Sequence, residues 1–105
     1  MSQYSVYANT NTSTKSIYPY LLDVQSPLLD SLETRLVIPL SLKSKFNDKS
    51  MKNLTPIISI NGVDYLVLTP QMAAIQKKHL GAFIVECSNN RTEILSSIDF
   101  LITGF

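Results

Sequence analysis

The pair Asn61-Gly62, set between two short apolar runs, constrains the fold of this chain more than any other feature. Both residues accept the positive φ angles that a two-residue type I′ turn requires. The segment Ile57 to Leu68 is therefore predicted to form a β-hairpin in which Ile60 faces Val63. Because this hairpin carries apolar residues on both faces, we expect it at the centre of a sheet.

Five further segments have the length and the apolar content of β-strands. Two of them contain a proline, Pro19 or Pro39, and prolines in sheets belong at edges or bulges. Neither segment is therefore expected to be a central parallel strand. The five segments are Gln3 to Tyr7, Ile17 to Val24, Thr34 to Leu40, Gln71 to Ile75 and Leu80 to Val85.

The connections between these segments are polar or contain turn residues. We expect a mobile loop over Ala8 to Ser16, which is rich in Asn, Thr and Ser, and a polar turn over Gln76 to His79. A hydroxyl residue followed by proline predicts a single helical turn or a tight turn over Ser26 to Asp30. The segment Ser41 to Asn53 is expected to be an exposed connection whose charges are solvated. Its lysines are Lys43, Lys45, Lys49 and Lys52.

The last part of the chain changes to a helical period. Apolar residues recur there at the spacing of one helical face, which predicts an amphipathic C-terminal helix. Ser88, Asn89 or Asn90 can begin it, and Asn90 with Glu93 resembles a capping box. Gly104 is placed as a stop signal. The apolar residues are Ile94, Leu95, Ile98, Leu101, Ile102 and Phe105. From the spacing alone, Phe105 either completes this stripe or binds a partner.

Composition limits the class of protein. A chain of 105 residues has room for one hydrophobic core, so we expect a single domain over residues 1–105. With 45% apolar and 16% charged residues, it is more apolar and less charged than an average soluble domain of this length, which suggests a buried interface. A net charge of +1 does not favour direct nucleic-acid binding. The single Cys87, the lack of a signal peptide and the lack of an apolar stretch of ~20 residues predict a cytoplasmic protein that does not enter a membrane.

The residues needed for catalysis are sparse. His79 is the one imidazole, and neither a nucleophile nor an orienting group can be assigned to it from the sequence. No spacing of Cys, His or acidic residues indicates a metal site. The glycines lie singly at positions 62, 81 and 104, so no phosphate-binding loop is formed. We therefore expect a binding protein without a cofactor rather than an enzyme.

Several blocks of sequence resemble the CcdB family of toxins from toxin–antitoxin pairs. The blocks run in one register, and only the Ala8 to Ser16 loop is longer than in the best-known member. They are Tyr4-Ser5-Val6-Tyr7, Asp23-Val24-Gln25-Ser26, Leu28-Leu29-Asp30, Arg35 to Leu40, Thr69 with Met72-Ala73, and the closing Gly104 with a large apolar residue. The resemblance implies a mainly β fold, an SH3-like, partly open barrel with a C-terminal α-helix.

The resemblance also implies a function and its residues. Members of this family bind the A subunit of DNA gyrase as homodimers, trap the gyrase–DNA cleavage complex, and are neutralised by a CcdA-type antitoxin whose disordered tail folds on binding. DNA is then contacted only through gyrase or the antitoxin complex. Carried over by position, the gyrase-binding residues are Gln3, Tyr7, Ser26, Leu28, Asp99, Thr103, Gly104 and Phe105. The best-known member has tryptophan where this chain has Thr103, and asparagine where it has Asp99.

Two alternatives stay open at the level of sequence. The MazF and Kid toxins are similar in fold and cleave RNA, for which Arg35, Arg91 and His79 are the candidate groups beyond lysines here. The chain could also be a non-toxic binding protein that keeps the CcdB fold.

Overall fold

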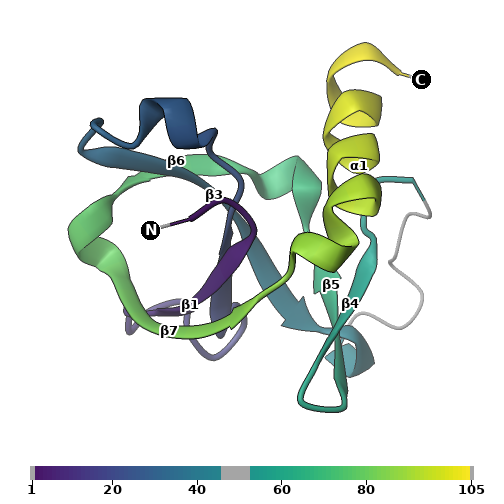
Figure 1. Cartoon of the computed structure of the whole chain (residues 1–105). Coiled ribbons are helices and arrows are strands. Elements are labelled where there is room, and N and C mark those ends of the chain that lie inside the picture. Colours follow the sequence, from purple (N-terminus) through teal and green to yellow (C-terminus); the bar gives the residue numbers. More distant parts are fainter. Residues whose placement is uncertain (1, 46–52, 105) are drawn as a thin grey trace.

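The computed structural model describes residues 2–45 and 53–104, which form a curled β-sheet with one α-helix (Figure 1). The strands are β1 (Ser5–Asn9), β2 (Tyr20–Asp23), β3 (Thr34–Leu42), β4 (Ile57–Ile60), β5 (Val63–Val67), β6 (Ala73–Gln76) and β7 (Leu80–Glu86), and the helix is α1 (Arg91–Thr103). Short 3-10 turns are η1 (Pro27–Leu29), η2 (Lys43–Lys45), η3 (Thr69–Gln71), η4 (Lys77–His79) and η5 (Ser88–Asn90).

The sheet is antiparallel throughout and has the strand order β4-β5-β3-β2-β1-β7, with β6 also paired to β3. Figure 1 shows β6, β3, β1 and β7 arranged around a ring, with α1 beside the β4–β5 hairpin. Within the described segments β6 and β7 are not paired, so the ring stays open there. The structure thus confirms the mainly β, partly open barrel with a C-terminal helix.

The strand β3 lies inside the sheet, so the expected edge or bulge position of Pro39 is wrong, whereas the expectation that this segment is not a central parallel strand is confirmed, because all its pairings are antiparallel. It pairs with β2 along one edge, and with β6 and then β5 along the other. Leu68 donates its N–H to the carbonyl of Pro39 at 3.0 Å, and a strand residue directs its N–H and C=O to the same side. The missing N–H of Pro39 therefore points to the junction between β6 and β5, where no ladder bond is lost.

The β4–β5 hairpin is confirmed, including its register. Ile60 pairs with Val63, while Asn61 and Gly62 have φ angles of 52° and 80°. Its expected central place is wrong, because β4 is an edge strand. Leu66 on the second apolar face is nevertheless fully buried, and its strand β5 lies between β4 and β3.

Two connections differ from their predicted form. The strand β1 continues to Asn9, and the following loop is tied down by that side chain, whose Nδ2 donates to Thr14 Oγ1 and to the Tyr18 carbonyl. The strand β3 extends to Leu42, so Ser41 is buried rather than exposed. The helical turn after Ser26 and the turn at Lys77–His79 are confirmed. Lys49 and Lys52 lie outside the described residues.

The hydrophobic core lies between one face of the sheet and α1. Ile94 is the buried apolar residue of the helix, and Ser97 Oγ lies 2.9 Å from the buried hydroxyl of Thr69. This contact holds α1 against η3. The core residues are Tyr4, Val6, Leu22, Val24, Ile38, Leu40, Ile58, Ile60, Tyr65, Val67, Cys87 and Ile94.

The predicted stop signal of α1 is confirmed, whereas the predicted capping box at its start is not formed. Gly104 adopts the left-handed conformation with a φ angle of 81°, and its N–H bonds to the Phe100 carbonyl at 2.9 Å, as a C-cap does. Asn90 precedes the helix, but its amide donates to the Glu93 carboxylate instead of capping the backbone. The helical parts that the structure describes include none long and apolar enough to cross a bilayer.

Replacing Gly62 by alanine tests the hairpin turn. A Cβ at this position would meet no atom within 4 Å, so the change adds only the conformational cost of positive φ. We expect Gly62→Ala to lower the free energy of unfolding by about 1 kcal/mol in urea denaturation. Asn61→Gly keeps the turn conformation and should leave stability within about 0.5 kcal/mol of the parent. Equal stability of all three proteins would contradict the turn assignment.

Candidate functional site

A buried ionic cluster joins β2, β3 and the η1 turn. Arg35 and Asp23 both have 0% side-chain exposure, and Arg35 contacts the Asp23 carboxylate at 2.7 Å through Nη2 and 2.9 Å through Nε. Its Nη1 reaches Asp30 Oδ1 at 2.6 Å, where the carboxylate is 49% exposed. One guanidinium therefore connects the strand that precedes the turn with the residue that follows it.

The two carboxylates of the cluster differ in proton affinity. Burial raises the pKa of Asp23, and the N–H of Gln25 together with Arg35 offsets this only in part. The hydrogen bond from Arg35 lowers the pKa of the more exposed Asp30. Of the two carboxylates, the buried Asp23 therefore depends more on the Arg35 guanidinium to stay ionised.

The η1 turn carries two of the residues expected from the family resemblance. Ser26 accepts the N–H of Leu28 through its hydroxyl at 3.2 Å. Gln25 is buried, and its side chain donates to the Leu29 carbonyl and accepts the N–H of Leu36. Leu28 points into solvent with 92% exposure. An anchored backbone therefore presents an exposed apolar side chain.

Gln3 lies against the strand that leads into this turn. Its Nε2 donates to the Val24 carbonyl at 3.1 Å. The next residue, Tyr4, has an unusual φ angle of 66° and donates its N–H to the Asp23 carbonyl. Tyr7, by contrast, is buried, with its ring 6.0 Å from that of Phe83 in an edge contact. The structure thus brings Gln3 close to the turn but leaves little of Tyr7 accessible.

The remaining expected residues lie at the end of α1. Asp99, Thr103 and Gly104 are exposed, and the Thr103 hydroxyl donates to the Asp99 carbonyl at 2.7 Å. Ile102 is 71% exposed. Phe105 lies outside the described residues. Among those described, no hydrogen bond joins this helix end to the η1 turn, so the candidate residues form two groups.

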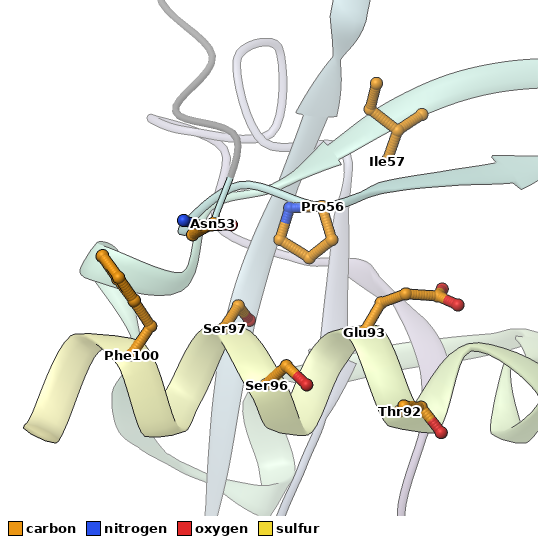
Figure 2. A pocket seen from close by; sticks show the side chains of 8 residues that line it. All are labelled: Asn53, Pro56, Ile57, Thr92, Glu93, Ser96, Ser97 and Phe100. Atoms are coloured by element: carbon orange, nitrogen blue, oxygen red, sulfur yellow. The ribbon is translucent and has the colours of Figure 1, made fainter. Parts of the chain in front are cut away.

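A groove separates α1 from the segment that leads into β4 (Figure 2). Figure 2 shows Phe100, Ser97 and Glu93 on the side of α1 that faces Asn53 and Pro56. Ile57, Thr92 and Ser96 complete its lining. Glu93 is its ionisable residue, and it already accepts a hydrogen bond from Asn90. The described residues that line the groove therefore offer no pair of groups for acid–base catalysis.

The three groups considered for RNA cleavage differ in burial and in their partners. Arg35 is held in the buried ionic cluster, whereas Arg91 is exposed at the start of α1. His79 is exposed on η4, and its carbonyl accepts the hydroxyl of Thr10. Over residues 2–45 and 53–104, no three His, Cys, Asp or Glu side chains are placed to hold a metal ion.

Fold and surface together define a small β-protein whose most exposed apolar residues lie on an anchored turn and at the end of its helix. The family model described as CcdB protein matches residues 3–104 of this chain. The chain therefore belongs to the CcdB family, whose members are toxins of toxin–antitoxin pairs.

Sequence reasoning missed the residues that support the turn. In the sequence, Asp23 and Asp30 stand out only as members of the blocks that resemble the family, and Arg35 also as a candidate group for RNA cleavage. An acidic residue ending one strand and an arginine starting the next could have indicated the ion pair. The register that brings them together, with Asp23 opposite Val37, comes from the structure.

Replacing Arg35 by methionine tests the ionic cluster. The change leaves the Asp23 carboxylate buried without its cation, and we expect a loss of about 3–5 kcal/mol in the free energy of unfolding at pH 7. Arg91→Met makes the same substitution at an exposed site and should change stability by less than about 0.5 kcal/mol.

The pH dependence of the Arg35→Met variant has a defined sign. Without Arg35, the folded-state pKa of Asp23 lies still further above its ordinary value of 3.8, so the neutral acid is favoured in the fold. The contribution of protonated Asp23 to the free energy of unfolding is fully present below the pKa of Asp23 in the unfolded chain. It is lost as the pH rises through the pKa of Asp23 in the folded protein. The deficit relative to the parent should therefore shrink between pH 7 and about pH 4 in urea titrations. A deficit that grows toward acid would refute this account.

Proposed function

We propose that this protein is the toxin of a type II toxin–antitoxin system and that it binds the A subunit of DNA gyrase. It traps the gyrase–DNA cleavage complex and carries out no chemistry of its own. Membership of the CcdB family supports the toxin role. The gyrase-binding surface comprises Gln3, Tyr7, Ser26, Leu28, Asp99, Thr103, Gly104 and Phe105.

The exposed end of α1 is the observation that carries this proposal. Ile94 and Ser97 are the buried residues of the helix, and its last turn is left in solvent. Ile102 there is 71% exposed and Leu101 is 39% exposed. Figure 1 shows this end of α1 extending past the sheet. An apolar surface that the fold itself does not bury is suited to docking into a partner.

The η1 turn provides a second contact region. Leu28 is an apolar anchor of the kind that fills a pocket on a partner, and Ser26 and Gln3 are polar groups near its base. Among the described residues of the set, Tyr7 is the least accessible and would contribute beside Phe83.

A homodimer would present two copies of this surface, which suits a target that is itself two-fold symmetric. We further propose that a CcdA-type antitoxin neutralises the toxin through a segment that orders on binding. The site of action is the cytoplasm, where gyrase acts on DNA.

The RNA-cleaving alternative is less well supported. Phosphoryl transfer needs cationic groups free to reach the reacting phosphate. Arg35 is fully buried between Asp23 and Asp30, which leaves Arg91 and His79 from the candidate set. The described structure places these two on different elements, α1 and η4.

A gyrase cleavage assay tests the proposed function. Purified gyrase, supercoiled plasmid and the parent protein should yield linear plasmid after denaturation of the complex. Ile102→Ser, and a variant lacking Gly104 and Phe105, should reduce the linear product at least about tenfold because each removes apolar contact area. Both should melt within about 2 °C of the parent because residues 102 and 104 are exposed.

The matched control for this assay is Val63→Ser, which removes an exposed apolar side chain from the hairpin tip, 44% exposed. It should leave cleavage unchanged. A truncated protein that still yields linear plasmid would refute the role of the helix end. If the parent yields none, the chain is a non-toxic relative, and degradation of added RNA would favour the endoribonuclease.

Substitutions of Thr103 test whether an aromatic ring at this position increases the affinity for the gyrase A subunit. Threonine has no ring that could stack on a cation, and its hydroxyl donates to the Asp99 carbonyl of its own helix. Thr103→Trp restores the aromatic residue of the best-known family member, which is thought to stack on an arginine of gyrase. We expect affinity for the gyrase A subunit to rise about 2–30-fold in titration calorimetry. Thr103→Leu adds apolar area without a π face and should give a smaller gain.

A further inference from the structure

Leu28 combines high exposure with an unusually well anchored backbone. Its side chain is 92% exposed, the highest value among the exposed large apolar residues of the described chain. It lies on η1, a 3-10 turn of three residues. Such short turns have little stability of their own, because their hydrogen bonds are few and poorly aligned. Groups outside the turn must therefore fix its conformation.

The end of the turn is fixed by side chains that lie outside it. The buried Gln25, which precedes the turn, donates to the carbonyl of Leu29, the last residue of η1, at 2.9 Å. Arg35 donates to the carboxylate of Asp30, the next residue, at 2.6 Å. Lys77, on η4, donates to the Asp30 carbonyl, also at 2.6 Å. The turn is thus connected to β3 and to η4, which lie outside its own segment.

We propose that Arg35, acting through Asp30, is a positioning residue that holds the turn in the conformation that presents Leu28 to the partner. The inference rests on the proposed function for the identity of that partner, the gyrase A subunit. Arg35 itself is fully buried and does not touch the partner. Its effect is to order the turn before binding, so that less conformational entropy is lost in the complex.

The cluster has the geometry for this role. Asp23 holds Arg35 Nε and Nη2 from the β2 side and leaves Nη1 directed at Asp30. The Asp23 carboxylate also accepts the N–H of Gln25 at 3.0 Å. The two anchors of the turn, Gln25 and Asp30, are therefore linked through one carboxylate and one guanidinium.

Asp30 is the position at which to test the proposal, since Asp23 and Arg35 are needed for the fold itself. Asp30 is half exposed, so Asp30→Ala removes the anchor while Arg35 keeps its buried partner Asp23. Asp30→Asn keeps an oxygen acceptor for Arg35 and is the conservative variant. Asp64→Ala is the matched control, because it removes an exposed carboxylate from β5.

The first measurement is backbone nitrogen relaxation by NMR on the free protein. We expect order parameters at Leu28, Leu29 and Asp30 of about 0.85 in the parent, falling to about 0.6 or below in Asp30→Ala. Asp30→Asn should retain intermediate to parental values, and Asp64→Ala should match the parent. Unchanged order parameters in Asp30→Ala would overturn the inference whether or not the protein binds gyrase.

The second measurement is titration calorimetry with the gyrase A subunit. Leu28→Ala should weaken binding about 10–100-fold, because a buried leucine side chain is lost. Asp30→Ala should weaken it about 3–10-fold, with substantial recovery in Asp30→Asn, because ordering the turn is added to the cost of binding. The double variant should bind no more weakly than Leu28→Ala alone, since Asp30 acts on binding by positioning the Leu28 side chain, which is then absent.

The outcomes separate this inference from the proposed function. If the parent does not bind the gyrase A subunit while Asp30→Ala loosens the turn, the proposed partner is wrong and the positioning role stands. If the parent binds, and the losses of binding free energy in Asp30→Ala and Leu28→Ala add up in the double variant, Asp30 does not act through Leu28. The inference then fails. An equal loss in Asp64→Ala would also overturn it, because a general effect of charge would then explain the result.

Discussion

The ion pair between Arg35 and Asp23 is the constraint on which the rest of this structure depends. Two fully buried charges lose their hydration, and only close mutual contact offsets that loss. The pair consequently fixes β2 against β3 from inside the sheet. Through Asp30 it also fixes the chain that leaves β2, although nothing in a three-residue turn would order it alone. A structural interaction in the core thereby determines the conformation of a surface segment.

The strand β3 distributes this constraint through the fold. It is the strand that β2, β5 and β6 all share, and it changes partner along one edge at Pro39. A proline elsewhere in so central a strand would remove a ladder bond, whereas here its lack of an N–H coincides with the gap between two partners. One strand therefore connects the β4–β5 hairpin with the ring of strands. The helix, which packs on η3, is joined to the same framework.

Local signals predicted local structure well. Asn61-Gly62 gave the hairpin and its register, and the spacing around Ile94 gave the helix, because turn chemistry and helical period act over a few residues. The edge position of β4 and the central position of β3 depend on pairings between distant segments, which no local pattern encodes. The candidate binding residues came from family resemblance, and the structure added their supports. The positions of Asp23 and Arg35 near adjoining strand ends could have indicated the ion pair, but the part that Gln25 and Arg35 play in holding the turn follows only from the register of β2 and β3.

The unpaired boundary between β6 and β7 has a consequence for how the molecule behaves at high concentration. An open strand edge is a template on which another chain can add a strand, and among the described residues β6 and β7 each have one such unpaired edge. Several features work against that addition. β6 has only four residues, Lys77 and Lys78 lie in the turn that links the two strands, and the ladder of β7 with β1 shifts register twice. Short length, positive charge and irregular twist are the means by which β-proteins limit association through their edges, and here they protect an edge that the curl of the sheet leaves open.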